Sequence, residues 1–122
     1  MSQPFKTVVL VVEDEPLLRM NTVDMVEDAG FEVVEAPGVA QALKLLESRG
    51  DISIVLSDID MPPGMNGLEL AELIRKRWPP VEVILLSGKY VPSDARLPKN
   101  HIFFSKPYRP SDVVAALHRV AS

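Results

Sequence analysis

Five short apolar runs recur along the chain, and polar or turn-forming residues follow each of them. The runs cover residues 7–12, 31–36, 52–57, 81–86 and 102–104. Runs of this length, rich in β-branched residues, predict β-strands that are buried on both faces. Pro62 follows the third run closely. Because proline cannot donate a hydrogen bond to a strand ladder, the third strand must end before it.

Segments with helical spacing of apolar residues separate these strands. They begin near residues 16, 39, 66 and 110, and glycine or proline ends the first three. Asn66 with Glu69 three residues later forms a capping-box pattern, with asparagine in place of serine or threonine. In residues 89–100, Pro92 and Pro98 leave room for about one helical turn. We therefore expect the fourth helix to be short or irregular.

Strands that alternate with helices predict a parallel sheet covered by helices on both faces. Right-handed crossovers leave few topologies for five strands. The natural choice is the flavodoxin-like, doubly wound (βα)5 fold with strand order 2-1-3-4-5. A length of 122 residues suits one core, so we expect residues 1–122 to form a single domain.

Composition narrows the range of functions. The net charge of −4 argues against a broad basic surface for nucleic acid, and the absence of cysteine excludes disulfides, thiolate metal sites and cysteine nucleophiles. No apolar run approaches the roughly 20 residues that span a bilayer. The amino terminus has no apolar signal-peptide region. These features predict a cytoplasmic protein with neither a nucleic-acid nor a membrane partner.

Polar residues gather at the predicted carboxyl ends of four strands. Glu13 and Asp14 follow the first strand, and Asp58, Ser87 and Lys106 end the third, fourth and fifth. Parallel strands bring these residues to one edge of the sheet. Carboxylates clustered there repel one another unless a cation such as Mg²⁺ binds between them. A carboxylate beside Mg²⁺ can attack phosphorus and form an aspartyl phosphate. Lys106 would offset charge on the phosphoryl oxygens, and Ser87 could donate a hydrogen bond to them.

Each signal has an ordinary explanation when taken alone. An acidic run after a strand is usually a solvated helix start, a serine there is usually a turn residue, and a lysine before proline is usually on the surface. The specific feature is their joint occurrence, each at the carboxyl end of its own strand.

Over essentially its full length, the chain resembles the receiver domains of response regulators in two-component signalling. Glu13 and Asp14 match the acidic pair, Asp58 matches the phosphoacceptor, Ser87 matches the hydroxyl position, and Lys106 before proline matches the invariant lysine with its cis-proline. The resemblance implies a receiver without an output domain that is a phosphoacceptor rather than an enzyme. Its phosphodonor would be the phosphohistidine of a sensor histidine kinase or of a histidine phosphotransfer protein.

The resemblance also implies a metal site. Asp14, Asp58 and the backbone carbonyl of Asp60 would bind Mg²⁺, and Glu13 would act mainly through water. After phosphorylation Ser87 would move toward the phosphate.

A switch residue and an output are implied as well. Phe103, which stands where tyrosine is common, would turn inward as Ser87 moves. The signal would pass to a separate downstream protein that the sequence does not identify. The sequence is also compatible with a weak homodimer. One departure from the family is an extra residue at Pro62-Pro63.

Three other classes of protein share part of this pattern. A haloacid-dehalogenase-like phosphatase also carries an Asp-x-Asp motif, here Asp58 to Asp60, but its acidic pair comes after the lysine and it normally needs a longer chain. A pseudo-receiver that only docks partners would not need the intact site. A flavodoxin that binds flavin would not favour acidic residues where the flavin phosphate binds.

Overall fold

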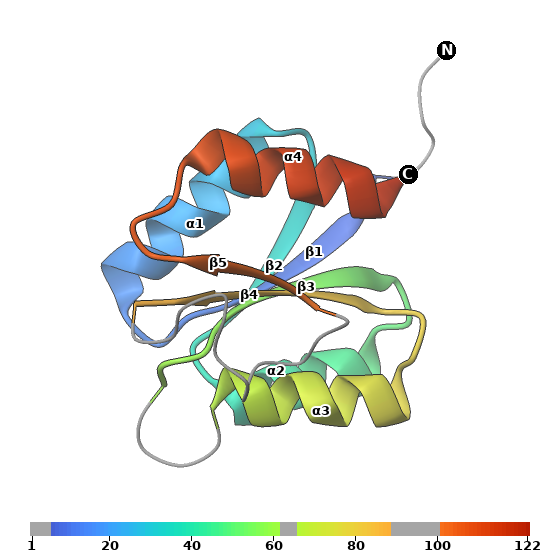
Figure 1. Ribbon diagram of the computed structural model, residues 1–122. Helices are drawn as coiled ribbons and strands as arrows, with labels where there is room; N and C mark the ends of the chain where they lie inside the picture. Colours follow the sequence, from blue (N-terminus) through green and yellow to red (C-terminus); the bar gives the residue numbers. More distant parts are fainter. Residues whose placement is uncertain (1–5, 62–65, 89–100) are drawn as a thin grey trace.

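The computed structural model describes residues 6–61, 66–88 and 101–122, which form a five-stranded parallel sheet between two layers of helices (Figure 1). The strands are β1 (Val8–Val12), β2 (Glu32–Ala36), β3 (Ile52–Asp58), β4 (Glu82–Ser87) and β5 (Ile102–Ser105). The helices of the described residues are α1 (Pro16–Asp28), α2 (Val39–Ser48), α3 (Gly67–Arg77) and the carboxyl-terminal α4 (Pro110–Ala121).

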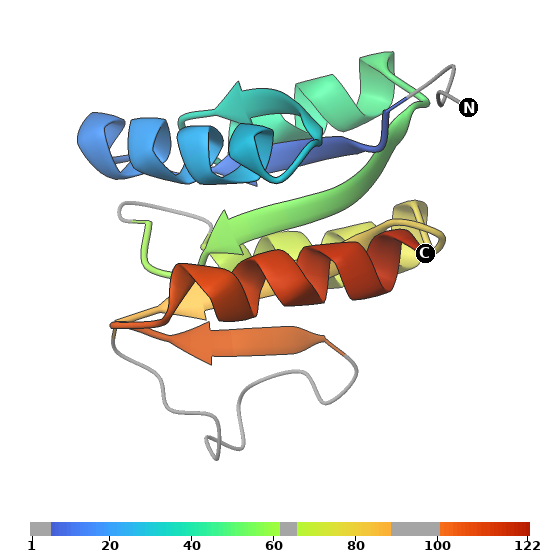
Figure 2. The ribbon, with the colours of Figure 1, turned by 90° about the horizontal axis from the view of Figure 1, so that it is seen from above.

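The sheet order is β2-β1-β3-β4-β5, which confirms the predicted flavodoxin-like topology. Figure 2 shows the β3 and β5 arrows ending on the same side of the molecule. The short or irregular helix expected between β4 and β5 falls on residues 89–100, outside the described part of the chain, and stays a prediction. Within the described ranges, no helix is long and apolar enough to cross a membrane.

Helices cover both faces of the sheet, with α1 and α4 on one face and α2 and α3 on the other (Figure 1). Alternate residues of β1 pack on opposite faces of the sheet: Val9 and Val11 pack in the core beneath α1 and α4 (the α1/α4 core), whereas Leu10 packs in the core beneath α2 and α3 (the α2/α3 core). Every residue of β1 is buried. Burial on both faces explains why the central strands are continuously apolar rather than alternating.

The same alternation assigns the polar strand ends to the two faces. Ile54 and Leu56 of β3 pack in the α1/α4 core, and so does Phe104 of β5. Because side chains alternate along a strand, Asp58 and Lys106 continue these rows on the α1/α4 side. Leu85 of β4 packs in the α2/α3 core, so Ser87 continues the opposite row.

Two caps fix the helices that flank the sheet edge. The predicted capping box is present: the Glu69 amide donates to Asn66 Oδ1 at 3.1 Å, and the Asn66 amide donates to Glu69 Oε1 at 3.0 Å. Glu15 caps α1 by accepting from the Leu18 amide at 2.8 Å, with Pro16 at the start of the helix. Side-chain caps of this kind typically contribute about 1 kcal/mol each.

Candidate functional site

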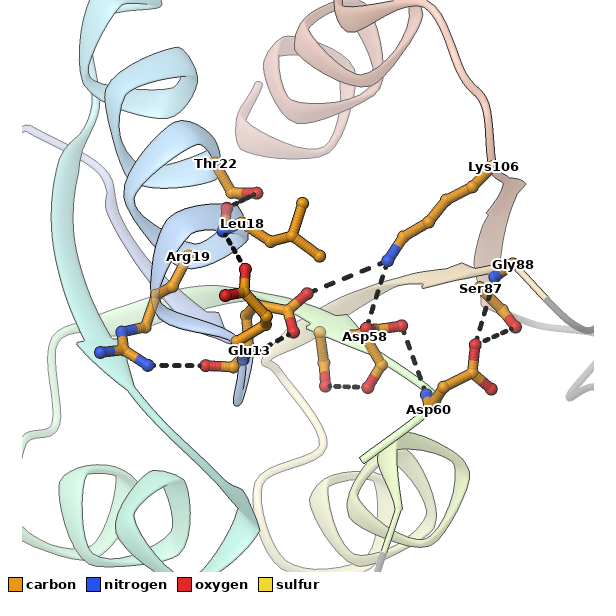
Figure 3. A network of polar contacts seen from close by, with 11 residues as sticks. Glu13, Leu18, Arg19, Thr22, Asp58, Asp60, Ser87, Gly88 and Lys106 are labelled. Carbon is orange, nitrogen blue, oxygen red and sulfur yellow. Dashed lines mark hydrogen bonds and ion pairs between the residues drawn. The ribbon is translucent and has the colours of Figure 1, made fainter. Parts of the chain in front are cut away.

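Asp58 ends β3 at the carboxyl edge of the sheet, and only 5% of it is exposed. Its Oδ2 accepts a hydrogen bond from Lys106 Nζ at 3.2 Å, and its Oδ1 accepts from the Asp60 amide at 3.3 Å (Figure 3). A buried carboxylate is expensive unless charged or polar groups pair with it. Lys106 and the Asp60 amide provide that pairing without enclosing the group completely.

Lys106 is held by both its backbone and its side chain. Its amide donates to the Ser87 carbonyl at 2.8 Å, which ties the end of β5 to the end of β4. Its Nζ also lies 3.9 Å from Glu13 Oε1. Burial alone would lower the pKa of Lys106, but the Asp58 and Glu13 carboxylates outweigh it and raise that pKa above its ordinary value. Lys106 therefore carries a positive charge at this edge. The peptide bond between Lys106 and Pro107 is cis, as the family resemblance implies.

Glu13 is the buried member of the acidic pair, with 6% of the residue exposed. Burial raises its pKa to about 8; the Glu15 amide, which donates to its Oε2 at 3.1 Å, opposes that rise, and the nearby Asp58 carboxylate adds to it. Ionising Glu13 beside the Asp58 carboxylate therefore costs free energy, which a further cation between the two groups would offset.

Asp14 lies in the turn before α1 and is exposed. The resemblance assigns direct metal binding to Asp14 and a water-mediated role to Glu13. In the structure Glu13 is the acid that shares Lys106 with Asp58. The division of roles between the two acids remains a prediction.

Arg19 is a site residue that the sequence did not reveal. Its guanidinium donates to the Glu13 carbonyl at 2.9 Å (Figure 3). It also donates to Glu35 Oε1 at 2.9 Å. It thereby ties the acidic turn to α1 and to β2. Arg19 is one helical turn beyond the Glu15 cap, but the partner at Glu35 depends on the pairing of β1 with β2, which no local pattern reveals.

Ser87 is fully buried at the end of β4, and its hydroxyl donates to Asp60 Oδ2 at 2.9 Å. The same carboxylate oxygen accepts from the Gly88 amide at 3.2 Å (Figure 3). Phe103, the predicted switch residue, is partly buried and packs against the α2/α3 core. Ser87 and Phe103 thus follow the rows on one face of the sheet, opposite to the rows that Asp58 and Lys106 continue.

The oxygen atoms at this edge suit Mg²⁺. Within the described ranges, no three acidic or histidine side chains converge into a preformed metal cage. Mg²⁺ does not require one, because it keeps several waters and needs only one or two carboxylates. The crowding of Glu13 against Asp58, with a raised Glu13 pKa, is the observation that favours a divalent cation here. These residues fit the ion that the resemblance implies.

A separate cavity of about 500 Å³ opens at the other end of the strands, beside the start of β3 and the carboxyl ends of α2 and α3. Arg77 lines it, paired with Glu47 at 2.8 Å and stacked 4.5 Å from the centre of the Trp78 ring. None of the predicted site residues lines this cavity. The predicted site therefore lies at the carboxyl edge of the sheet and not in this cavity.

Comparison with known proteins agrees with this geometry. The family model described as the response regulator receiver domain matches residues 9–118. The chemotaxis protein CheY of Thermotoga maritima is 36% identical over 118 residues, covering 93% of this chain and 96% of CheY. The sensor kinase CckA of Brucella abortus is 37% identical over 102 residues, or 75% of this chain, which spans only 11% of the kinase.

A solved structure of a response regulator has the same fold as this chain. The response regulator TrrA of Thermotoga maritima, in complex with Mg²⁺-BeF, superimposes with a TM-score of 0.81 at 28% identity, covering 93% of this chain and 98% of TrrA. The family match favours the receiver interpretation over the phosphatase and flavin-binding alternatives. With the sheet order, the buried aspartate and the lysine beside it, these matches lead to one conclusion: the chain belongs to the response regulator receiver domain family of two-component systems.

Proposed function

We propose that Asp58 accepts a phosphoryl group from the phosphohistidine of a sensor histidine kinase or of a histidine phosphotransfer protein. The observation that carries this proposal is the buried Asp58 carboxylate with Lys106 Nζ 3.2 Å away and Glu13 beside it. An Asp58 oxygen attacks phosphorus, the bond from phosphorus to the imidazole nitrogen breaks, and that nitrogen keeps the electron pair.

The residues around Asp58 divide the work in this reaction. When bound, Mg²⁺ supplies positive charge to the phosphoryl oxygens, and Glu13, Asp14, Asp58 and the Asp60 carbonyl are the groups proposed to hold it. Lys106 orients Asp58 through Oδ2 and adds a second positive charge at the same edge. Positioning and charge stabilisation are the main demands of phosphoryl transfer, so few other groups are needed.

We also propose that the phosphodonor packs against the first turns of α1. Leu17, Leu18 and Met20 are 64%, 45% and 52% exposed there, directly after the acidic turn. The Leu18 amide donates to the side chain of Glu15, which belongs to that acidic turn, at 2.8 Å. A phosphohistidine has to approach Asp58 to within bonding distance, so the donor protein must cover this neighbourhood. Exposed apolar side chains there suit a protein partner.

The output would be a conformational signal to a separate downstream protein, not catalytic turnover. Ser87 would move toward the phosphoryl group, and Phe103, which lies on the same sheet face, would repack in response. We propose that residues 1–122 act as one receiver unit in this way. A simple aryl phosphate should not be turned over.

Intact-mass measurement tests this proposal. Incubation with acetyl phosphate and Mg²⁺ should add the mass of one phosphoryl group to the wild type and none to Asp58→Asn. Asp51→Asn is the matched control, since Asp51 is an exposed acid that pairs with Arg49 away from the site. If Asp58→Asn gains the phosphoryl group at the wild-type rate, another residue is the acceptor and the proposal is wrong.

A further inference from the structure

Asp60 makes contacts that its proposed role in metal binding does not use. That role needs only its backbone carbonyl, yet its carboxylate reaches the end of β4, 27 and 28 residues away in sequence. One oxygen, Oδ2, accepts from both the Ser87 hydroxyl at 2.9 Å and the Gly88 amide at 3.2 Å. The backbone amide of Asp60 donates to Asp58 Oδ1 at 3.3 Å. One residue thus joins the phosphoacceptor to the switch serine (Figure 3).

The strength of this link follows from its chemistry. Hydrogen bonds to an ionised carboxylate are shorter and stronger than bonds between neutral groups. Two donors on one oxygen also fix the direction of the carboxylate. Ser87 is fully buried, so its hydroxyl needs a good acceptor in every state of the protein. Asp60 Oδ2 is an acceptor for this hydroxyl.

We propose that the Asp60 carboxylate is a positioning residue that holds the Ser87 hydroxyl in the unphosphorylated protein and must release it when Asp58 is phosphorylated. The Ser87 hydrogen bond then passes from Asp60 Oδ2 to a phosphoryl oxygen. This inference rests on the proposed function of Asp58. The new negative charge next to Asp60 favours the exchange, because like charges repel at short range. Asp60 therefore sets how readily the switch responds to the phosphoryl group.

A double-mutant cycle on beryllofluoride binding with Mg²⁺ separates this role from a simple charge effect. Asp60→Ala keeps the backbone carbonyl but removes the competing acceptor for Ser87. In the wild-type background it should tighten beryllofluoride binding by about tenfold more than it does together with Ser87→Ala, which corresponds to about 1.4 kcal/mol of coupling. Asp60→Asn retains a side-chain oxygen and should fall between the wild type and Asp60→Ala.

The outcomes of the cycle are distinct. Equal fold-changes with and without Ser87→Ala would mean that Asp60 acts only through its charge, and the inference would be overturned while the proposed function stands. If the wild type itself binds no beryllofluoride, both the proposed function and the inference are wrong.

Hydrogen exchange of the Gly88 amide tests the same link without metal or phosphate mimic. Asp60→Ala removes the acceptor of that amide, and its exchange should become at least about fivefold faster. Asp51→Ala, an exposed acid paired with Arg49, is the control and should leave Gly88 exchange unchanged. Unchanged exchange of Gly88 in Asp60→Ala would contradict the proposed link.

Discussion

Replacing Glu13 with glutamine should remove a pH dependence of stability that the metal-free protein shows between about pH 5 and pH 8. The fold raises the pKa of Glu13 from 4.5 to about 8, mainly by burial. In this window the native state keeps a proton that the unfolded state has released. Because the native state binds more protons, the free energy of unfolding falls as pH rises through the window. Glutamine has no proton to lose, so the variant should lack this loss.

The expected magnitude comes from the size of the pKa rise. Each pKa unit corresponds to about 1.36 kcal/mol, so the full rise would amount to roughly 4–5 kcal/mol for a group that titrated alone. Lys106 Nζ lies 3.9 Å from Glu13 Oε1, and its positive charge stabilises the ionised form of Glu13 in part. We therefore expect the wild type to lose at least ~1 kcal/mol more stability than Glu13→Gln between about pH 5 and pH 8.

Urea unfolding followed by Trp78 fluorescence, in the absence of Mg²⁺, is the assay. His101 contributes with the opposite sign, because burial lowers its pKa and stability then rises with pH as the histidine loses its proton. Comparing the two proteins at each pH cancels this contribution. Glu47→Gln is the control, since Glu47 is an exposed acid that pairs with Arg77. An identical pH slope in the wild type and Glu13→Gln would refute the reasoning about the buried acid.

Three further predictions concern neighbouring parts of the site. Gly67→Ala would direct a Cβ against the Asp58 carbonyl oxygen. It should therefore lower the free energy of unfolding in urea by about 1–3 kcal/mol and slow phosphorylation by acetyl phosphate. If neither value changes, the close packing of Gly67 against Asp58 is contradicted. Asp14→Ala should weaken Mg²⁺ binding in calorimetry more than Glu13→Ala does, and equal effects would mean that the acids share the role. Leu18→Asp should slow phosphotransfer from a histidine kinase about tenfold or more while leaving the acetyl phosphate reaction unchanged; equal slowing of both would argue against a docking role.

The fold was predictable because its signals are local and repeated. Buried parallel strands have to be apolar at every position, and the turns between them carry proline, glycine and capping residues that mark the ends. The Asn66 cap and the strand order both follow from such signals and are confirmed. Asp58 and Lys106 were also brought together as predicted, because the carboxyl ends of all the parallel strands lie at one edge of the sheet, although β4 separates β3 from β5.

Side-chain direction beyond the strand ends was not predictable in the same way. Glu13 and Asp14 are adjacent acids in the sequence, and only the turn into α1 decides that Glu13 is buried beside Lys106 while Asp14 is exposed. The contact of Asp60 with Ser87 likewise depends on how the chain turns after β3. Leu18 has the spacing of a buried helical stripe, yet it is 45% exposed, whereas Val26, two turns further along α1, is buried.

Chemical mapping of the phosphorylated residue tests the central claim most directly. The protein is incubated with acetyl phosphate and Mg²⁺ and treated with borohydride, which reduces an aspartyl phosphate to homoserine, and its peptides are analysed by mass spectrometry. We predict conversion at Asp58, loss of the signal in Asp58→Asn, and no conversion at Glu13, Asp14 or Asp60. Conversion at one of those other acids, or at none while the intact protein carries a phosphoryl group, would contradict the assignment of Asp58 as the phosphoacceptor.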